Sequence, residues 1–193
     1  MLTPFLFLFA LPGPQAAWDV LTKGPTLTEC TESSGAVYCR STAVFDAKVD
    51  VLAQTITTMA SQADKFDSII AVNTLEPDVL HVVMDFPAPL ADRDYVARFK
   101  RVDRDDGGLT LVWTPVIHDK APPTDSIVRL EGYEGSWSLT PISETQTRVE
   151  YLWLGTYGGA LPSFALNTAR KKTAVEAMKD LSKASGGVSF KAP

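Results

Sequence analysis

The order of the expected elements predicts an α+β fold, in which a curved antiparallel sheet wraps around one long C-terminal helix. Stretches rich in β-branched and aromatic residues, each ended by turn residues, follow one another through the middle of the chain. From Pro162 to Ala184 nothing after the first position breaks a helix. The helices are segregated from the strands, which is typical of α+β rather than α/β proteins. We therefore expect a space for a ligand between the sheet and the long helix.

Length and composition restrict the class of protein. The 193 residues fit one domain, and 45% hydrophobic with 21% charged residues is ordinary for a globular chain. A net charge of −5 argues against a nucleic-acid partner, which would need clustered Lys and Arg. Two Cys and two His give no recognisable zinc spacing, so we expect no metal and no other cofactor. We expect a monomer.

The first 17 residues resemble a secretory signal. They carry no charged side chain, and their apolar run from Phe5 to Leu11 is shorter than the roughly 20 residues that span a bilayer. The small residues Ala16 and Ala17 follow it. We predict a signal peptide over residues 1–17 and an exported protein, periplasmic or secreted. The alternative is a partly buried N-terminal strand or helix.

The two cysteines predict a disulfide. Cys30 and Cys39 bracket the turn dipeptide Ser34-Gly35. If these two residues form a hairpin loop, Cys30 lies opposite Cys39 in a non-hydrogen-bonded pair, where Cα atoms approach to about 4.5 Å. That distance is within the range a disulfide tolerates. A disulfide agrees with export, whereas two reduced thiols would indicate a cytosolic protein.

The remaining elements follow in order. A strand over 35–45 leads to Asp46, a candidate helix N-cap, and to a helix with apolar residues at helical spacing over 48–61. β-Branched and aromatic runs then predict strands over 68–75, 79–86, 95–102, 109–117, 127–139 and 147–155. The last helix covers 162–184, and residues 185–193 are expected to be a flexible tail.

Five short motifs carry a resemblance to a known family. The segment Asp92-Arg93-Asp94-Tyr95-Val96, preceded by a Pro-rich lead over 86–90, resembles the Arg-Asp-aromatic-Val motif of START lipid-transfer domains. Four further segments are similar to that family in the same order; they are 116–122, 128–131, 135–141 and 158–162. The resemblance covers about residues 18–184. It implies a START-like helix-grip fold with an internal tunnel that holds one lipid, and no chemistry on that lipid.

The resemblance also implies a set of site residues. Sterol carriers of the family have a buried Arg facing the tunnel where this chain has Phe99; Arg98 should face the other way, because strand side chains alternate. The lipid class is therefore left open. We expect the ligand to contact the apolar and aromatic side chains Phe99, Trp113, Val128, Leu130, Trp137, Trp153, Phe164 and Met178. Structural ion pairs are expected among Arg93, Asp94, Arg129 and Glu131.

The expected function is non-enzymatic binding and transfer of a single hydrophobic lipid: a sterol, a phospholipid or a related molecule. The loop 117–125 and the C-terminal helix are expected to gate the tunnel, with transient membrane contact during transfer. An alternative is an aromatase or cyclase acting on a polycyclic or polyketide substrate, which needs an acid–base pair inside the tunnel. The candidates for such a pair are His81, Tyr95, Glu150 and Tyr151. A lipid-switched sensor is a third possibility that sequence does not separate from a carrier.

Overall fold

A single sheet dominates the structure, a computed structural model that describes residues 12, 16–86, 90–158 and 163–193. The predicted signal peptide therefore lies almost entirely outside the described residues. Within them, eleven strands pair in the order β1-β2-β3-β10-β9-β7-β6-β5-β4, with β11 added to β3 and β8 added to β6. Their bounds are β1 Asp19–Lys23, β2 Leu27–Ser33, β3 Ala36–Phe45, β4 Ile69–Glu76, β5 Val79–Met84, β6 Arg93–Asp103, β7 Leu109–Pro115, β8 Val128–Arg129, β9 Gly135–Pro141, β10 Thr147–Leu154 and β11 Phe190–Lys191.

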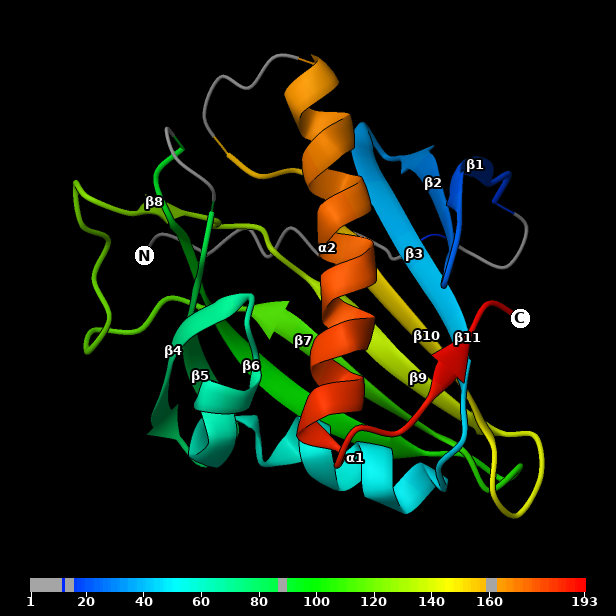
Figure 1. Ribbon diagram of the computed structural model, residues 1–193. Coiled ribbons are helices and arrows are strands. Elements are labelled where there is room, and N and C mark those ends of the chain that lie inside the picture. The colour runs from blue at the N-terminus through cyan, green and yellow to red at the C-terminus, as the bar shows by residue number, and fades with distance from the viewer. Residues whose placement is uncertain (1–11, 13–15, 87–89, 159–162) are drawn as a thin grey trace.

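The long helix α2, Ser163–Ala184, lies along the concave face of this sheet (Figure 1). The helix α1, Val49–Thr57, and the 3₁₀ helix η1, Met59–Lys65, contact α2 and each other. Every strand pair except β6 with β8 is antiparallel. The α+β arrangement of a curved antiparallel sheet around a C-terminal helix, predicted from the sequence, is confirmed.

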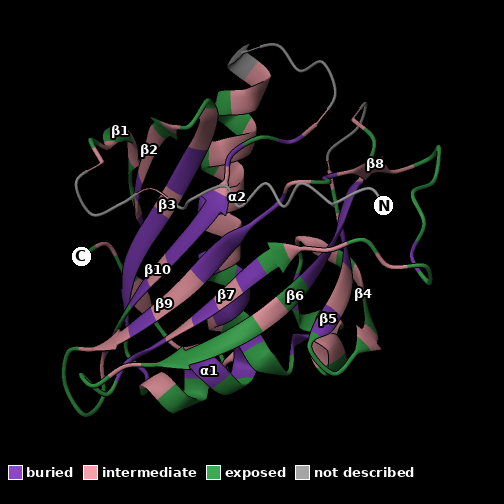
Figure 2. Cartoon of the chain, turned by 180° about the vertical axis from the view of Figure 1, so that it is seen from behind, coloured by how far each residue is buried: buried purple, intermediate pink, exposed green. Residues whose placement is uncertain are grey.

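The core lies between the central strands and one side of α2. Tyr38 and Cys39 on β3, Leu139 on β9 and Trp153 on β10 are fully buried. The buried apolar residues of α2 are Ala174, Met178, Leu181 and Ala184. Figure 2 shows the buried residues concentrated in the central strands, while the far end of β6 is exposed. The apolar side chains of α2 therefore hold the helix to the sheet through one of its faces only.

The first hairpin has the predicted register. Ser34 and Gly35 both have positive φ, at 53° and 77°, as a two-residue type I′ loop requires. Ser33 pairs with Ala36, and the ladder continues to Cys30 opposite Cys39. Their Cα atoms are 4.0 Å apart, and a disulfide joins them. The predicted bond is confirmed.

Two local predictions were wrong at the junctions of β3. Asp46 does not cap α1, because its carboxylate instead accepts hydrogen bonds from Gln146 Nε2 at 2.8 Å and from the Ser189 hydroxyl. Lys48 precedes the helix and makes no side-chain cap. Nor is the whole of 185–193 a free tail: Phe190–Lys191 forms β11, and the Phe190 ring stacks on Phe45 at 5.0 Å between centroids.

The strand predicted over 127–139 is divided in two. β7 ends at Pro115, opposite Ala97. The residues of β6 before Ala97 therefore have no partner on β7. β8 occupies that edge in parallel, with Val128 beside Arg93. The chain then turns before β9 begins at Gly135. In the part of the chain that the structure describes, no helix combines the length and the apolar character needed to span a membrane.

The disulfide leads to a direct test. Protein purified without reductant should contain no free thiol in a thiol titration and two after reduction. Replacing both Cys30 and Cys39 by Ser should lower the free energy of unfolding by about 2–3 kcal/mol, because the short loop is no longer closed in the unfolded chain. Urea unfolding of the reduced wild-type protein is the control and should match the double variant. Two titratable thiols in the unreduced native protein would contradict the prediction.

Candidate functional site

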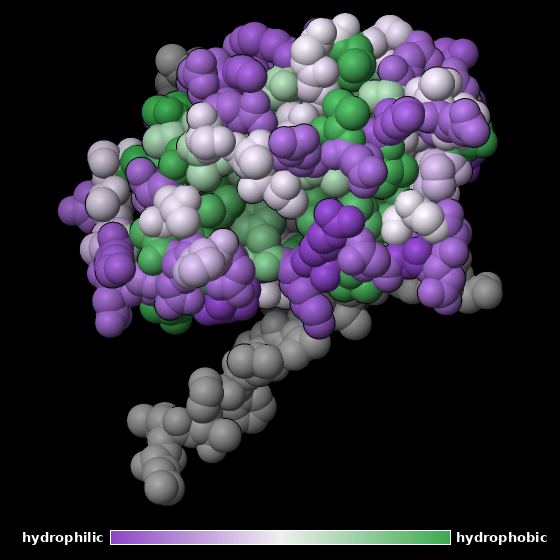
Figure 3. Space-filling view, turned by 90° about the horizontal axis from the view of Figure 1, so that it is seen from below, coloured by the Kyte–Doolittle hydropathy of each residue, from purple (hydrophilic) through white to green (hydrophobic). Residues whose placement is uncertain are grey.

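A cavity of about 290 Å³ lies between the concave face of the sheet and α2. It is lined from α1, η1, β4–β7, β9, β10 and α2. Residues between these elements also line it: Phe66, Ser68, Asp85, Phe86 and Leu90. Figure 3 shows hydrophobic side chains gathered at the centre of the face seen from below, bordered by polar ones. The cavity therefore occupies the space between the sheet and the long helix where the sequence analysis predicts a ligand site.

The sheet side of the cavity is mainly aromatic. Tyr95, Phe99, Trp113, Trp137 and Tyr151 line it from four strands. Their rings form a continuous surface: the centroids of Phe99 and Trp113 are 6.2 Å apart, those of Trp113 and Tyr151 5.7 Å, and those of Trp137 and Tyr151 4.3 Å. Strand alternation places these residues on one face of the sheet. The resulting wall suits an apolar ligand.

Gly135 makes room for Trp113. The two residues are paired across β9 and β7. A Cβ added to Gly135 would lie 2.3 Å from Cζ2 of Trp113 and 2.1 Å from the carbonyl oxygen of Leu152. The indole therefore lies across the glycine, and any side chain there would push it away.

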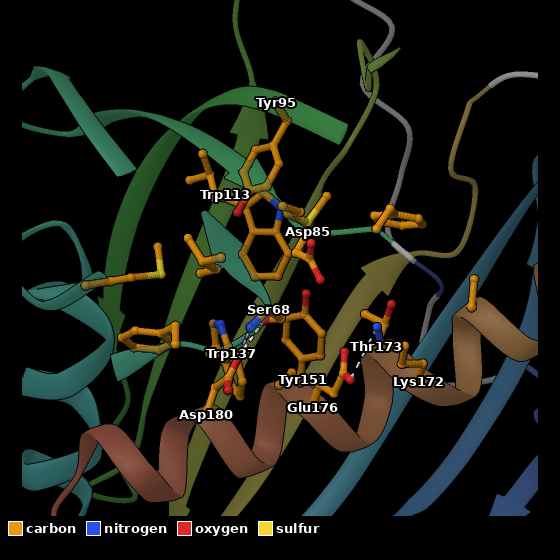
Figure 4. Close-up of a pocket in the computed structure, with 18 of the residues that line it drawn as sticks. Ser68, Asp85, Tyr95, Trp113, Trp137, Tyr151, Lys172, Thr173, Glu176 and Asp180 are labelled. Atoms are coloured by element: carbon orange, nitrogen blue, oxygen red, sulfur yellow. Dashed lines mark hydrogen bonds and ion pairs between the residues drawn. The ribbon is translucent and has the colours of Figure 1, made fainter. Parts of the chain in front are cut away.

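The helix side of the cavity is formed by two rows of residues with four-residue spacing. One row is small: Ala165, Ala169, Thr173 and Ala177. The other is polar: Thr168, Lys172, Glu176 and Asp180. Residues four apart share a helix face, and each residue of the polar row follows one of the small row by three positions. The two rows therefore lie side by side on the face that lines the cavity. Figure 4 shows Thr173, Glu176 and Asp180 projecting from α2 toward the aromatic residues of the sheet.

The charged groups of this wall are already paired. Lys172 Nζ lies 3.6 Å from Glu176 Oε1, with both side chains more than a third exposed. Burial raises the pKa of Glu176, although Lys172 works against this. The Asp180 carboxylate accepts hydrogen bonds from the backbone N–H groups of Asp67 and Ser68 and from the Ser68 hydroxyl. Among the described residues, no group of three or more His, Cys, Asp or Glu is placed to hold a metal ion.

The phenol groups beside the cavity stay protonated near neutral pH. Burial raises the pKa of Tyr95, Tyr133 and Tyr151 above the ordinary value of a phenol. Tyr133 is buried behind the lining, and its hydroxyl lies 3.2 Å from that of Tyr151. These groups can act as hydrogen-bond donors, but their pKa values are far from those of an acid or base that works near pH 7.

The structure places only part of the expected ligand set at the cavity. Phe99, Trp113 and Trp137 line it, and Arg98 faces away to pair with Glu76 and Asp78, as strand alternation predicts. Whether a ligand touches these residues stays a prediction. The side chain of Phe164 lies outside the described residues.

Four residues of the expected set lie elsewhere. Trp153 is fully buried, and its Nε1 donates to Tyr157 Oη at 3.3 Å. Met178 is on the core face of α2. Val128 and Leu130 lie in and after β8, beyond the cavity. Sequence reasoning missed the lining residues Ile56, Met59, Val82, Met84 and the two rows of α2, although the four-residue spacing of those rows could have revealed them.

One of the expected ion pairs forms. Arg129 donates two hydrogen bonds to the Asp94 carboxylate, at 2.8 and 2.7 Å. His81 Nε2 lies 2.7 Å from the same carboxylate. Burial alone would raise the pKa of Asp94, but the hydrogen bonds from Arg129 and His81 outweigh it, so the pKa lies below its ordinary value. This network ties β5, β6 and β8 together on the outer face of the sheet.

Arg93 and Glu131 do not join it. Arg93 is next to Asp94 on β6 and so points to the opposite face, where its Nε donates to the Tyr157 carbonyl at 3.1 Å and its guanidinium lies 4.4 Å from the Phe86 ring centroid. Glu131 is exposed and has no ion pair within the described residues, because β8 ends at Arg129.

The loop 117–125 does not cover the cavity. Ala121 is buried against Val79 and Val96 on the outer face of the sheet, and its carbonyl accepts a hydrogen bond from Arg129 at 3.0 Å. No residue of the loop lines the cavity. The expected gate at this loop was therefore misplaced, since the loop packs on the wrong side of the sheet.

A curved sheet gripping a C-terminal helix, with an aromatic cavity between them, defines a helix-grip protein. The chain belongs to the START domain family, whose sequence model matches residues 17–188. It is 28% identical to rat phosphatidylcholine transfer protein over 102 residues, which are 51% of this chain and 48% of that protein. It is 34% identical to human StAR-related lipid transfer protein 7, mitochondrial, over 85 residues, 40% of this chain and 23% of that protein.

The chain thus matches about a quarter to a half of the length of these relatives. Among solved structures, it is similar to a StAR-related lipid transfer protein fragment from Xanthomonas axonopodis, with a TM-score of 0.72 and 20% identity over 85% of this chain and 96% of that one. That likeness concerns the fold.

The close approach at Gly135 predicts that Gly135→Ala destabilises the protein by about 1–3 kcal/mol in urea unfolding, because both the Trp113 ring and a strand carbonyl would have to move. Trp113 fluorescence should change with it. Gly24→Ala is the matched control, since nothing lies within 4 Å of its added Cβ. Equal stability of the two variants would show that the indole does not lie over Gly135.

The Asp94 network predicts a pH-dependent stability. Asp94→Asn should lower the free energy of unfolding by about 3 kcal/mol at pH 7, because Arg129 loses its partner in a buried site. A lowered pKa in the folded protein stabilises it above the unfolded pKa of about 3.9, and this contribution is lost as the pH falls through the lowered value. The difference between variant and wild type should therefore shrink below about pH 4.

Asp103→Asn is the control for this prediction, because its ion pair with Arg101 is exposed and should contribute less than about 1 kcal/mol. Urea unfolding at pH 7 and pH 3 measures both variants. An Asp94→Asn effect that is small at pH 7, or unchanged at pH 3, would contradict the role given to the network.

Proposed function

We propose that this chain binds one hydrophobic lipid in the cavity between the sheet and α2 and transfers it without changing it chemically. The observation that carries the proposal is the aromatic wall of five side chains facing a row of small residues on the helix. Each Å² of apolar lipid surface buried there contributes about 25 cal/mol. Membership of the START family and the names of the relatives support lipid as the ligand.

The placement of the ionisable groups supports binding rather than catalysis. His81 and Glu150, two candidates for acid–base work, lie away from the cavity: His81 pairs with Asp94, and Glu150 lies 3.8 Å from Arg40. The other two, Tyr95 and Tyr151, have raised pKa values because they are buried. An acid–base step near pH 7 would have no suitable group among these four.

One observation favours the aromatase or cyclase alternative. The Lys172–Glu176 pair lines the cavity, so the wall does contain a paired acid and base. Both side chains are more than a third exposed, and each neutralises the other. An exposed i,i+4 pair of this kind is common on helices, so the carrier remains the function that the cavity supports best.

Export and membrane contact belong to the same proposal. The disulfide fits an oxidising compartment, such as the periplasm or the exterior of the cell. Transfer would need brief membrane contact by a monomer and movement of α2. The helix is the remaining candidate for a gate, since it forms one wall of the cavity.

Native mass spectrometry of the protein from its own cells, with organic extraction, tests this function. A single lipid at one per chain is the expected result. The mature mass also reports cleavage after Ala17. An empty protein that converts polycyclic substrates would overturn the carrier proposal in favour of the enzyme.

A cavity-filling variant gives the matched prediction. Ala169→Phe places a ring in the small row, so it should reduce lipid loading at least tenfold while leaving the thermal midpoint within a few degrees. Lys171→Phe, at an exposed position of the same helix, should load lipid normally. The ratio of loaded to empty protein in native mass spectra measures both. Normal loading of Ala169→Phe would place the lipid elsewhere.

A further inference from the structure

Trp113 carries a buried hydrogen-bond donor that no described residue accepts. The residue is 2% exposed and lines the cavity, and its indole Nε1 has no hydrogen-bond partner. Buried polar groups in folded proteins nearly always have a partner, because an unmade hydrogen bond costs about 1–3 kcal/mol. The orphan therefore points to a group that is supplied from outside the chain.

Further unused donors surround it. The rings of Trp113 and Tyr95 both contact the Tyr133 ring, with centroids 6.3 and 4.8 Å away. The Tyr95 hydroxyl makes no hydrogen bond to any described residue, and Tyr95 also lines the cavity. The hydroxyls of Tyr133 and Tyr151 share one hydrogen bond, which leaves one of their two hydrogens over. Within the described part of the chain, these four groups therefore carry four donor hydrogens, of which one is used in a hydrogen bond.

The charge around these donors selects against an anion. Lys172 is paired with Glu176 on the helix wall. Arg93 is on the same face of β6 as Tyr95, but it is held by the Tyr157 and Ala91 carbonyls and is not part of the lining. Among the described residues of the lining, an anion beside the phenols would find no free cation, and it would share the cavity with the Asp85 and Asp180 carboxylates. The same burial that raises the pKa of the phenols disfavours any other negative charge there.

We infer that the sheet side of the cavity binds an uncharged oxygen of the lipid, a carbonyl, ester or hydroxyl oxygen that accepts hydrogen bonds from Trp113 Nε1 and Tyr95 Oη. The inference rests on the proposed function and deepens it. It makes Trp113 and Tyr95 specificity-determining residues, and it selects lipids that carry a neutral oxygen over pure hydrocarbons and over lipids whose buried end is anionic.

Three probes of similar chain length separate these classes: methyl palmitate, octadecane and palmitate. Each is delivered from methyl-β-cyclodextrin to the full-length protein, and loading is read by native mass spectrometry. Trp113→Phe and Tyr95→Phe each remove one donor and keep an aromatic ring. Each should lower methyl palmitate loading about fivefold relative to octadecane loading, the size of one hydrogen bond. The ratio cancels both the affinity for cyclodextrin and the loss of apolar contact.

Trp153→Phe is the matched control, because Trp153 is not part of the cavity lining and its Nε1 already donates to Tyr157 Oη. It should leave the ratio unchanged. An unchanged ratio in both Trp113→Phe and Tyr95→Phe overturns the inference and leaves lipid binding intact. A wild-type protein that loads palmitate in preference to methyl palmitate overturns the inference as well. Loading of none of the probes also overturns it, and the extracted native lipid then decides whether the proposed function fails too.

Discussion

Helix α2 has to bury part of its surface against the sheet and yet stay far enough from the sheet elsewhere to leave a cavity. Ala174, Met178 and Leu181 meet the first requirement, since all three are buried in the core. The second is met by the small row beside them, in which no residue is larger than Thr173. Polar contacts fix the helix at two points: Arg170 Nε donates to the Gly155 carbonyl at 2.9 Å, and the hydroxyl of Ser185, just after the helix, donates to the Thr55 hydroxyl. The spacing between helix and sheet is therefore held from outside the cavity.

The sheet wall that faces the small row of α2 is built from large aromatic rings. Aromatic side chains bury 150–250 Å² each and are stiff, so a wall of five can define an apolar surface without collapsing onto the helix. Gly135 contributes because it has no side chain, which lets the Trp113 indole lie across β9. The large side chains of the cavity therefore lie on the sheet wall, and the small ones lie on the helix wall. A sheet held in register by many backbone hydrogen bonds is the better place for the bulk.

Local periodicity explains which parts of this arrangement the sequence reveals. The alternation along β6 predicts Phe99 toward the helix and Arg98 away from it, and the Ser34-Gly35 loop predicts Cys30 opposite Cys39; the structure agrees with both. Periodicity cannot distinguish Trp153 from Tyr151, which lie two apart on the same face of β10. One is sealed in the core and the other lines the cavity. The difference depends on where α2 crosses the sheet, and that is set by contacts distant in sequence.

The polar row of α2 illustrates the same limit and gives the cavity its polarity. A search for one apolar stripe finds the core face of the helix and passes over Lys172 and Glu176, although they face the ligand space. Charged side chains line the cavity from α2 and at Asp85, just after β5, whereas the aromatic residues of the sheet wall offer only uncharged donors. Charges are cheaper to keep hydrated than to bury, whereas a neutral donor needs only one acceptor. A lipid that places a neutral oxygen against Trp113 and any charged end along α2 would satisfy both walls at once.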